Sequence, residues 1–309
     1  FHIDSDSKVV DIASNDGILL RAWRELGVSA LGVEPAENLC RLARADGLGT
    51  LNEFFTRETV GKIGVESAHL VTAINVFAHV PEIGEFAQNV RRLLHPYGVF
   101  VAEVQYLRDT ITGLSFDNIY FEHVFYWTLT TLERLLASAG LYVIDAERVD
   151  THGGSLRVYA NTGEDYWSTA PARIRYQEKQ MGLDRLETYQ EFAQKVEKVR
   201  SDLVELLHRL QADGKIIAGY GAPAKATTLL NYCGIGPETI KYIIDDAPLK
   251  QGRYLPGVRI PVVSMAEAEK EPPHWLVLLA WNFADSLVAQ SRHLGARYVM
   301  PVPPGILGG

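Results

Sequence analysis

Short β-branched runs alternate with helical patterns through the first hundred residues of the chain. Strands are expected at 8–12, 30–33, 69–75 and 98–104, and helices at 18–26, 38–45 and 84–94. Further on, a helix is expected at 128–138 and strands at 142–149 and 155–161. Strands that alternate with helices in this way form parallel sheets covered on both faces. The first part of the chain is therefore predicted to be a doubly wound α/β domain.

A second α/β pattern begins at Lys215, with strands expected at 215–220, 240–245, 275–280 and 297–300 and a helix at 226–232. Between the two patterns, apolar residues keep helical spacing from Leu186 to Leu210, which indicates a long amphipathic helix that packs across both halves. The prediction is two Rossmann-like doubly wound α/β units joined by a long helix. Their expected bounds are residues 1–165, a connector at 166–213, and residues 214–309.

The chain of 309 residues has a formal net charge of -8 and no dense run of Lys or Arg. This balance argues against a nucleic-acid polymer or an anionic membrane as a partner and favours small molecules. Cys40 and Cys233 lie far apart, so neither a disulfide nor a metal site is expected. No apolar stretch reaches transmembrane length and no signal peptide is recognisable. We expect a cytoplasmic monomer or homodimer, and the lack of an initiator Met suggests that residues precede Phe1.

The turn after the first expected strand reads DIASNDG, residues 11–17. In open α/β sheets, ligands bind where this turn meets the N-terminus of the next helix. The turn has a single glycine and two carboxylates, which repel the phosphates of a dinucleotide but suit a cationic amino acid. S-Adenosylmethionine fits, with its ammonium group and ribose hydroxyls held by Asp11 or Asp16 and by loop backbone groups. The alternative is that Ser14, Asn15 and Asp16 merely cap the helix.

Glu34 ends the second expected strand about twenty residues further on, where an acidic side chain can accept hydrogen bonds from both ribose hydroxyls. This separation favours the cofactor site over the helix cap. Asn75 and Val76 end the next long strand, near the expected methionine end of the cofactor. Phe54 would flank the adenine or pack in an aromatic pair, and His79 is more often structural in such a position. The expected cofactor site comprises Asp11, Ala13, Ser14, Asn15, Asp16, Gly17, Glu34, Pro35, Phe54, Asn75 and Val76.

Residues 106–127 form a longer connection than is routine, and such loops are usually functional or disordered. Their aromatic content argues against disorder. The end of this stretch, NIYFEHVFYW, sets a carboxylate, an imidazole and two phenols among large apolar rings. Methylation of a carbon next to a ketone needs a base to form an enolate, and His123 suits that role because imidazole ionises near neutral pH. Glu122 or a tyrosine would orient it, and a phenol would donate to the enolate oxygen. Alternatively, Glu122 and His123 form a polar pair at a loop edge.

Four segments occur in order over nearly the whole chain: VVDIASNDGILL, NIYFEHVFYWTLTTLERLLASAGL, DTHGGSLRVY and GYGAPAKATTLLNYCGI. Together they resemble the S-adenosylmethionine-dependent sugar C-methyltransferases, which act on nucleotide-linked 4-keto deoxysugars in antibiotic and polysaccharide pathways. The resemblance implies a class I methyltransferase domain with a C-terminal α/β domain, a substrate that is a dTDP-sugar, and S-adenosylhomocysteine as a product. It also implies that His123 takes the C3 proton, with Tyr120 and Glu122 in supporting roles.

The chain departs from this family in two places. Members usually carry an N-terminal zinc-binding module built on cysteines, and nothing like it occurs in this sequence, either because it was removed or because this is a shortened relative. This departure bears on the range of substrates more than on the reaction class. Ala13 stands where the family usually has glycine, a small change that bears on the affinity for the cofactor.

The small-residue turn GYGAPAK opens the expected helix of the second unit beside a lysine, and such a helix N-terminus is a ready anion site. In the family that the chain resembles, the C-terminal unit helps to hold the sugar nucleotide. The diphosphate is therefore assigned to Tyr220, Gly221, Ala222 and Lys225. A rival NAD site at Gly219, Gly221 and Asp245 is disfavoured because Ala224 occupies the third glycine position.

Two further places offer contacts to sugar or phosphate. HGGSLR supplies His152, Gly153, Ser155 and Arg157, although a tight hairpin with a strand arginine explains the same residues. Asn282 follows the strand expected at 275–280 and would face the substrate. Two other functions stay open, a sugar O-methyltransferase and a non-catalytic protein that binds a nucleotide sugar or the cofactor. The intact YFEH set and the acidic turn favour an enzyme.

Overall fold

The computed structural model describes residues 1–163, 168–212 and 214–308. The chain forms two compact units, one of Phe1–Arg108 with Glu122–Asp184 and the other of Asp109–Phe121 with Arg185–Gly309. A short segment in the middle of the first unit thus belongs to the second. The expected domain boundaries at 165 and 213 fall on residues outside the described ranges, and the chain passes from the first unit to the second after Asp184.

The first unit is built from alternating strands and helices, as expected. Its elements are β1 Val9–Ile12, α1 Ile18–Glu25, β2 Ala30–Val33, α2 Glu37–Ala45, β3 Thr50–Leu51, α3 Arg57–Ile63, β4 Ala68–Ile74, α4 Ile83–Leu93, β5 Leu94–Gln105, α6 Leu129–Ser138, β6 Tyr142–Val149, η2 Thr151–Gly153, β7 Ser155–Asn161 and α7 Ala170–Gln180. Each predicted strand and helix of this unit is present within a few residues of its expected bounds. The sequence did not indicate α3 and α7, whose patterns are less regular.

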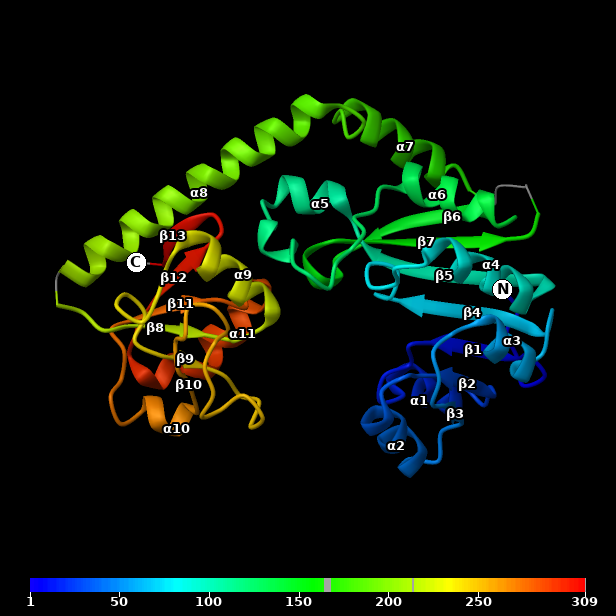
Figure 1. Cartoon of the computed structure of the whole chain (residues 1–309), viewed down its shortest axis with the longest axis horizontal. Coiled ribbons are helices and arrows are strands. Elements are labelled where there is room, and N and C mark those ends of the chain that lie inside the picture. The colour runs from blue at the N-terminus through cyan, green and yellow to red at the C-terminus, as the bar shows by residue number, and fades with distance from the viewer. Residues whose placement is uncertain (164–167, 213, 309) are drawn as a thin grey trace. The chain divides into compact units, whose positions relative to one another are not determined.

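The seven strands form one sheet in the order β3-β2-β1-β4-β5-β7-β6. Strands β1 to β5 are parallel, and β7 runs antiparallel between β5 and β6 (Figure 1). Chain order reverses between β1 and β4, so the connections that leave these two strands diverge at their carboxyl ends. In this register Asp11 of β1 lies between Gly32 of β2 and Thr72 of β4. A ligand site is expected at this edge.

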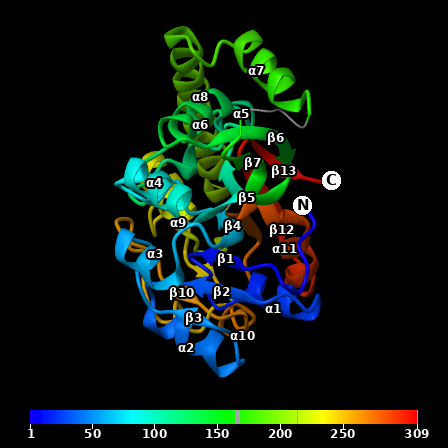
Figure 2. The same cartoon turned by 90° about the vertical axis from the view of Figure 1, so that its right-hand side faces the viewer.

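Helices cover the two faces of the first sheet unequally. The main core packs α3, α4 and α6 against one face, with Phe77, Phe86, Phe100 and Trp127 at its centre. The other face carries a smaller core in which Trp23 of α1 joins Val9 and Leu70. Figure 2 shows α3 and α4 on one side of these strands and α1 on the other. The sheet is thus a doubly wound layer, as predicted.

The second unit repeats the plan. Its elements are α8 Leu186–Ala212, β8 Ile217–Tyr220, α9 Ala224–Cys233, β9 Ile243–Ile244, β10 Val262–Val263, α10 Met265–Ala268, β11 Trp275–Leu278, η3 Trp281–Phe283, α11 Ala284–Ser291, η4 Arg292–Leu294, β12 Arg297–Pro301 and β13 Pro304–Leu307. The sheet order is β10-β9-β8-β11-β12-β13, with only β13 antiparallel to its neighbour. Renumbered from β8, this order reads 3-2-1-4-5-6, the Rossmann arrangement. One face packs α8 and α9, the other α10 and α11.

The expected long helix is α8, and its buried residues all belong to the core of the second unit. They are Val196, Val199, Leu203, Leu206, Leu207 and Leu210. The helix belongs to the second unit, and its packing across both halves stays a prediction. The connection 106–127 is also not an irregular loop throughout, because it contains α5 Leu107–Thr112 and η1 Phe116–Asn118. Tertiary packing orders it, since Phe116 is buried in the core of the second unit.

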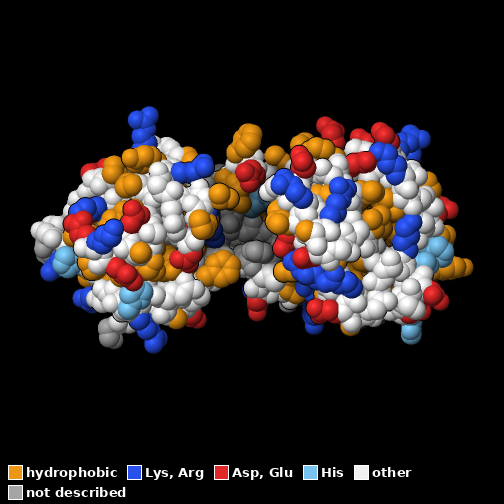
Figure 3. Space-filling model, turned by 90° about the horizontal axis from the view of Figure 1, so that it is seen from below, with side chains coloured by type: hydrophobic (Ala, Val, Ile, Leu, Met, Phe, Trp, Pro, Cys, Tyr) orange, Lys and Arg blue, Asp and Glu red, His pale blue; other side chains and the backbone are white. Residues whose placement is uncertain are grey.

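The surface carries charges of both signs. On the face shown in Figure 3, Lys and Arg side chains are interspersed with Asp and Glu. Within the described part of the chain, no helix combines the length and the apolar character that crossing a membrane requires. Cys40 and Cys233 are buried free thiols. The described residues also contain no group of three or more His, Cys, Asp or Glu side chains arranged to hold a metal ion.

Candidate active site

The turn between β1 and α1 reverses direction through left-handed backbone conformations. Ala13 has a φ of 56°, Asn15 of 53° and Gly17 of 86°. Asn tolerates this region and Gly adopts it freely, whereas Ala pays a steric cost because its Cβ approaches the carbonyl oxygen. A Cβ at Gly17 would lie 2.5 Å from Leu48 Cδ1, so this glycine is also required by packing. The alternation of left-handed residues turns backbone N–H groups of the loop toward β2.

Glu34, which follows β2, holds this turn in place. Its buried carboxylate accepts hydrogen bonds from the backbone N–H of Asn15 at 3.0 Å and of Ala36 at 2.8 Å. Asn52 Nδ2 donates to the carbonyl oxygens of Glu34 and Pro35 at 2.9 and 3.0 Å. Each carboxylate oxygen of Glu34 keeps a further lone pair for a hydroxyl donor. The side chain is therefore rigid and can still accept hydrogen bonds from a ligand.

Asp11 is a buried acid of the turn whose pKa is shifted. Its side chain is buried, and Oδ1 accepts a hydrogen bond from Thr72 Oγ1 at 2.5 Å. Burial raises the pKa of Asp11 to about 6, the nearby Glu34 adds to the rise, and the Thr72 hydrogen bond opposes it. Asp16 is different, because it forms an ion pair with Arg21 at 2.8 Å. Asp11 and Asp16 were both candidates to bind the ammonium group of the cofactor. Among the ion pairs of the described residues, Asp16 has a cationic partner and Asp11 has none.

The chemistry of this pocket fits S-adenosylmethionine. Two buried carboxylates, Asp11 and Glu34, face the same sheet edge and favour a cation and hydroxyl groups over a phosphate. Ser14 Oγ is buried and has no hydrogen-bond partner among the described residues, which leaves a polar group for a ligand or a water. Gly32 is required beneath it, since a Cβ there would lie 2.3 Å from Ser14 Oγ. The residues present could thus hold the ribose and amino-acid parts of the cofactor.

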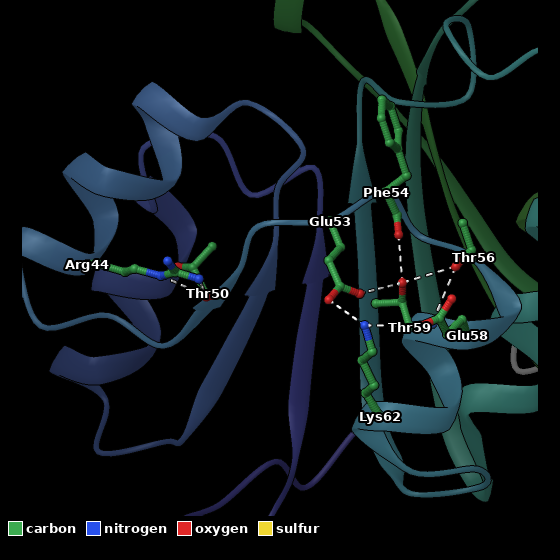
Figure 4. Close-up of polar contacts among 8 residues, drawn as sticks. All are labelled: Arg44, Thr50, Glu53, Phe54, Thr56, Glu58, Thr59 and Lys62. Carbon is green, nitrogen blue, oxygen red and sulfur yellow. Dashed lines mark hydrogen bonds and ion pairs between the residues drawn. The ribbon is translucent and has the colours of Figure 1, made fainter.

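Phe54, the expected adenine neighbour, lies in a segment that is fixed by its polar contacts. Glu53 forms an ion pair with Lys62 at 2.6 Å, and Thr59 Oγ1 donates to the carbonyl oxygen of Phe54 at 2.7 Å (Figure 4). The Phe54 ring is 74% exposed and points away from this cluster. In place of the aromatic pair expected as the alternative, the Phe55 ring packs on Phe86, with ring centroids 5.2 Å apart. The Phe54 ring is free to cover a ligand.

Asn75 and Val76 lead from β4 into the loop that meets the expected catalytic stretch. Asn75 has a φ of 57°, and its N–H donates to the carbonyl oxygen of Glu103 at 2.8 Å. Val76 is buried, and Phe77 behind it packs edge-on against Trp127 with ring centroids 6.1 Å apart. Two loops far apart in sequence are thereby held together by their aromatic anchors.

His79 and His123 meet above these anchors. Their ring centroids are 4.9 Å apart, and the N–H of Val124 donates to the carbonyl oxygen of Ala78 at 2.8 Å. His79 Nδ1 lies 2.9 Å from the carbonyl oxygen of Glu122. Because a carbonyl oxygen can only accept, Nδ1 of His79 carries the proton in this contact. His123 is consequently held against the loop that follows β4, at the sheet edge where the carboxylates of the first turn lie.

The other two members of the expected catalytic set take different places. Glu122 contacts His79 through its main-chain carbonyl, and its side chain is exposed. Tyr120 belongs to the second unit, while Glu122 and His123 belong to the first. The ring centroid of Tyr126 lies 6.4 Å from that of His123 in an edge-on arrangement. The sequence did not single out His79 or Tyr126 as neighbours of His123, since no local pattern links residues 79 and 123.

Arg157, an expected substrate contact, is engaged by carboxylates. Its Nε and Nη2 donate to Oε2 of the buried Glu103 at 3.0 and 2.8 Å, and Nη1 donates to Glu147 at 3.2 Å. Thr151 Oγ1 donates to the other oxygen of Glu103 at 2.6 Å, and the buried Ser155 Oγ donates to the carbonyl oxygen of Thr151 at 3.1 Å. The network fixes the turn that contains His152 and Gly153. The side chain of His152 lies outside what the structure describes.

In the second unit, Lys225 opens α9 and its ammonium group is largely buried. Nζ donates to Asn282 Oδ1 at 3.0 Å, lies 3.6 Å from Asp117 Oδ2, and sits 4.4 Å from the ring centroid of Trp281. Burial lowers the pKa of Lys225, and the charge of Asp117 opposes that shift. Lys225 and Asn282, both predicted as substrate contacts, are thus brought together. Asp117 and Trp281 were not predicted, because no pattern in the sequence connects them to the turn.

The turn after β8 is held by Asp245. Its carboxylate accepts hydrogen bonds from the N–H of Ala222 at 2.7 Å and of Ala247 at 2.9 Å, and Lys250 Nζ donates to it at 3.0 Å. Gly221 has a φ of 90°, and a Cβ there would lie 2.8 Å from Ala280 Cβ. Tyr220 points elsewhere: its buried phenol donates to Gln290 Oε1 at 2.8 Å within the same unit. Of the expected diphosphate contacts, the backbone at 221–222 and Lys225 lie at the turn, and the Tyr220 hydroxyl does not.

The sheet order of the first unit, its acidic turn and the buried acid after β2 define a class I methyltransferase. Comparison with known proteins agrees: residues 1–146 match the family described as methyltransferase domain, and residues 150–303 match the C-methyltransferase C-terminal domain. The chain is 38% identical over 302 residues to C-methyltransferase NovU of Streptomyces niveus, which covers 96% of this chain and 72% of that protein. The chain belongs to the S-adenosylmethionine-dependent C-methyltransferases, and the expected family, fold class and cofactor are confirmed.

Other similarities extend over about half of the chain. The ubiquinone biosynthesis O-methyltransferase of Methylobacterium sp. (strain 4-46) is 27% identical over 180 residues, 52% of this chain and 71% of that protein. Among solved structures, a SAM-dependent methyltransferase from Archaeoglobus fulgidus superposes with a TM-score of 0.43 at 14% identity, covering 52% of this chain and 87% of that chain.

Proposed function

We propose that this enzyme methylates a nucleotide-linked 4-keto deoxysugar at the carbon next to the ketone, with His123 as the base. The observation that carries the proposal is the position of His123 in the first unit. Its ring lies beside that of His79 on the loop after β4, at the same sheet edge as Asp11 and Glu34. A base at that edge lies on the side of the sheet where the methyl donor is expected to bind. The nucleotide-sugar class comes from the resemblance of the four sequence segments to sugar C-methyltransferases.

The chemistry assigned to the chain is the removal of one proton and the stabilisation of the charge that follows. His123 accepts the proton from the carbon α to the ketone, and the electron pair of that C–H bond becomes the enolate. Bound S-adenosylmethionine would supply the electrophilic methyl group for the enolate carbon and leave as S-adenosylhomocysteine. Tyr120 and Tyr126 are the phenols nearest in sequence to His123 and are proposed donors to the enolate oxygen. His79, through Glu122, keeps the base in place.

The nucleotide portion is assigned to the second unit. We place the diphosphate at the backbone N–H groups of Gly221 and Ala222 and at Lys225, because a small-residue turn at a helix N-terminus favours an anion. Asn282 accepts a hydrogen bond from Lys225 and is proposed to contact the sugar or phosphate. Arg157 and the turn at 152–155 remain proposed substrate contacts, with their orientation set by Glu103. The proposed substrate is a dTDP-sugar.

The test is mass spectrometry of reactions run in deuterated water with S-adenosylmethionine and a dTDP-4-keto-6-deoxyhexose. Wild type should incorporate solvent deuterium next to the ketone and form a carbon-bound methyl group. His123→Ala should lose both while retaining cofactor binding, and His208→Ala, an exposed histidine on α8, should behave as wild type. Methyl transfer that continues in His123→Ala would exclude this histidine as the base.

A second candidate, O-methylation of a sugar hydroxyl, has one observation in its favour, since the first unit is also similar to the ubiquinone biosynthesis O-methyltransferases. That reaction needs no enolate, so it would give an oxygen-linked methyl group without deuterium next to the ketone. A non-catalytic binding protein would bind the cofactor and the nucleotide sugar and turn over neither. The same experiment distinguishes the three.

A further inference from the structure

Residues 109–121 join the second unit, although the chain on both sides of them belongs to the first. Within this segment η1 packs on α9, and Phe116, Asp117 and Asn118 are all buried. The Phe116 ring lies 5.2 Å from that of Tyr232 at the end of α9. The segment includes Tyr120, and Glu122 and His123 follow it directly in the chain. Whatever fixes it in the second unit therefore also positions Tyr120, a proposed donor to the enolate oxygen.

Asp117 makes a buried polar contact that helps to hold the segment in the second unit. Its side chain is 0% exposed, and Oδ2 accepts a hydrogen bond from Trp281 Nε1 at 2.7 Å. The same oxygen lies 3.6 Å from Lys225 Nζ. Lys225 in turn donates to Asn282 and stacks over the Trp281 ring. One carboxylate from the segment thus meets two elements of the second unit, the start of α9 and the turn η3.

The members of this cluster depend on one another. Burial raises the pKa of Asp117, and the charge of Lys225 and the Trp281 hydrogen bond oppose the shift. A buried charge that loses its partner is strongly unfavourable, so removal of one member weakens the hold on the others. The contact is therefore specific rather than an adaptable surface pair, and it ties the segment to the residue proposed for the diphosphate.

We infer that Asp117 is a positioning residue of the reaction, which sets Tyr120 by anchoring the segment that contains it to Lys225 and Trp281. The expected effect of Asp117 on turnover rests on the proposed function. Asp117 lies three residues before Tyr120 and six before His123 in the sequence. A displacement of about 1 Å in a catalytic group can cost about a hundredfold in rate. Loss of the anchor should lower the rate of the chemical step without weakening the cofactor site of the first unit.

Three variants separate the parts of the anchor. Asp117→Ala removes the carboxylate, Asp117→Asn keeps an acceptor for Trp281 but loses the charge facing Lys225, and Trp281→Phe keeps a ring and loses the donor. Leu207→Ala is the matched control, because Leu207 is buried on α8 in the same core and its truncation destabilises the unit without removing the cluster. Each is measured for KM and kcat in the deuterium assay, for binding of S-adenosylmethionine, and for hydrogen exchange of the backbone N–H groups of Asn118, Ile119 and Val124.

The expected result for Asp117→Ala is exchange at Asn118 and Ile119 at least tenfold faster, a kcat about 10- to 100-fold lower and unchanged affinity for S-adenosylmethionine. Asp117→Asn should fall between Asp117→Ala and wild type, whereas Leu207→Ala should keep its kcat. Unchanged exchange in Asp117→Ala would overturn the anchor, and faster exchange with normal kcat would overturn its role in the reaction. If wild type methylates no 4-keto nucleotide sugar, the proposed function fails, and the exchange data alone decide whether Asp117 anchors the segment.

Discussion

Glu34 and Asp245 hold equivalent positions in the two units. Each directly follows the second strand counted from the start of its unit's sheet, β2 for Glu34 and β9 for Asp245. Each accepts a hydrogen bond from the turn after the first strand, from Asn15 at 3.0 Å and from Ala222 at 2.7 Å. Each also accepts one from the backbone two residues ahead. Both units therefore fix their first turn to the neighbouring strand with a carboxylate.

Loss of the Asp245 carboxylate should lower stability, whereas loss of the Glu34 carboxylate should also lower the affinity for the cofactor. Burial would raise the pKa of Asp245, but the N–H groups of Ala222 and Ala247 and the Lys250 ammonium outweigh it, so the pKa lies below 3.8. A lowered pKa means that the carboxylate stabilises the fold at neutral pH and loses this effect as the pH falls through that value. Asp245→Asn should destabilise the second unit by about 1–3 kcal/mol at pH 7, as judged by urea unfolding.

Glu34→Gln is the matched variant in the first unit. It also removes hydrogen-bond acceptors from a turn, but we expect it to reduce the affinity for S-adenosylmethionine at least tenfold, because the carboxylate is a proposed acceptor for the ribose hydroxyls. Asp245→Asn should leave that affinity unchanged. Calorimetric titration with the cofactor measures both. Equal effects of the two variants on cofactor affinity would contradict the assignment of the site to the first unit.

The charge of Asp11 should affect the pH dependence of stability in the opposite direction to that of Asp245, because the pKa of Asp11 is raised. Its pKa is raised to about 6, so the folded state binds a proton more tightly than the unfolded chain, and the buried charge costs stability above that pH. Asp11→Asn keeps an acceptor for Thr72 and removes the charge. The variant should be more stable than wild type at pH 8 by up to about 3 kcal/mol, from about two pKa units at 1.36 kcal/mol each. The gain should shrink between pH 6 and 4 and disappear below.

The measurement is thermal unfolding of both proteins without cofactor across that range, with cofactor affinity determined at pH 8. Asp11→Asn should bind S-adenosylmethionine more weakly, because an ammonium partner is lost. Thr72→Val removes the hydrogen bond that lowers the Asp11 pKa, so it should move the transition to higher pH. A stability difference that does not change with pH would show that Asp11 is not the group responsible.

Ala13 offers a change that should stabilise the protein. With a φ of 56° it occupies a conformation that costs an L-residue about 1–2 kcal/mol, and glycine avoids that cost at the expense of greater freedom in the unfolded chain. Ala13→Gly should therefore raise stability by about 0.5–1 kcal/mol, measured by urea unfolding. Ala22→Gly, at an exposed position in α1, is the control and should lower stability by about 1 kcal/mol. If both variants destabilise, the strain assigned to the turn is absent.

Glu103 and Arg157 predict a coupled loss of stability. Glu103 is buried and its partner guanidinium is about one third exposed, so breaking the pair should cost less than a fully buried one, about 2 kcal/mol. Glu103→Gln and Arg157→Met should each have this effect. The double variant should cost clearly less than the sum, because the second change removes a group that is already unpaired. Unfolding by urea gives the three values.

Glu147→Gln is the control for this pair. Glu147 contacts the same guanidinium at 3.2 Å but is 48% exposed, so its loss should change stability little. The turn at 151–153 should become more mobile in Glu103→Gln but not in Glu147→Gln, since Thr151 donates a hydrogen bond to Glu103. Additive effects of Glu103→Gln and Arg157→Met would indicate that the pair does not act as one unit.

Local sequence was enough to predict the alternation of strands and helices, the two α/β units and the acidic turn with Glu34 beyond it. Apolar periodicity and turn residues report the conformation of neighbouring residues, and the spacing of Asp11 and Glu34 follows from one strand–helix–strand repeat. The same patterns do not say which distant segments will pack together. The sequence therefore predicted candidate residues for the site but not which of them contact one another.

Tertiary structure decided the partners. His79 lies beside His123 because Phe77 and Trp127 pack together in the core, although the two histidines stand far apart in the chain. Asp117 reaches Trp281 across 164 residues, and both belong to the second unit together with residues 109–121. Arg157 remains a predicted substrate contact, and its ion pair with the buried Glu103 could not be foreseen from the sequence. Burial and pairing of charges depend on non-local packing, which no local period records.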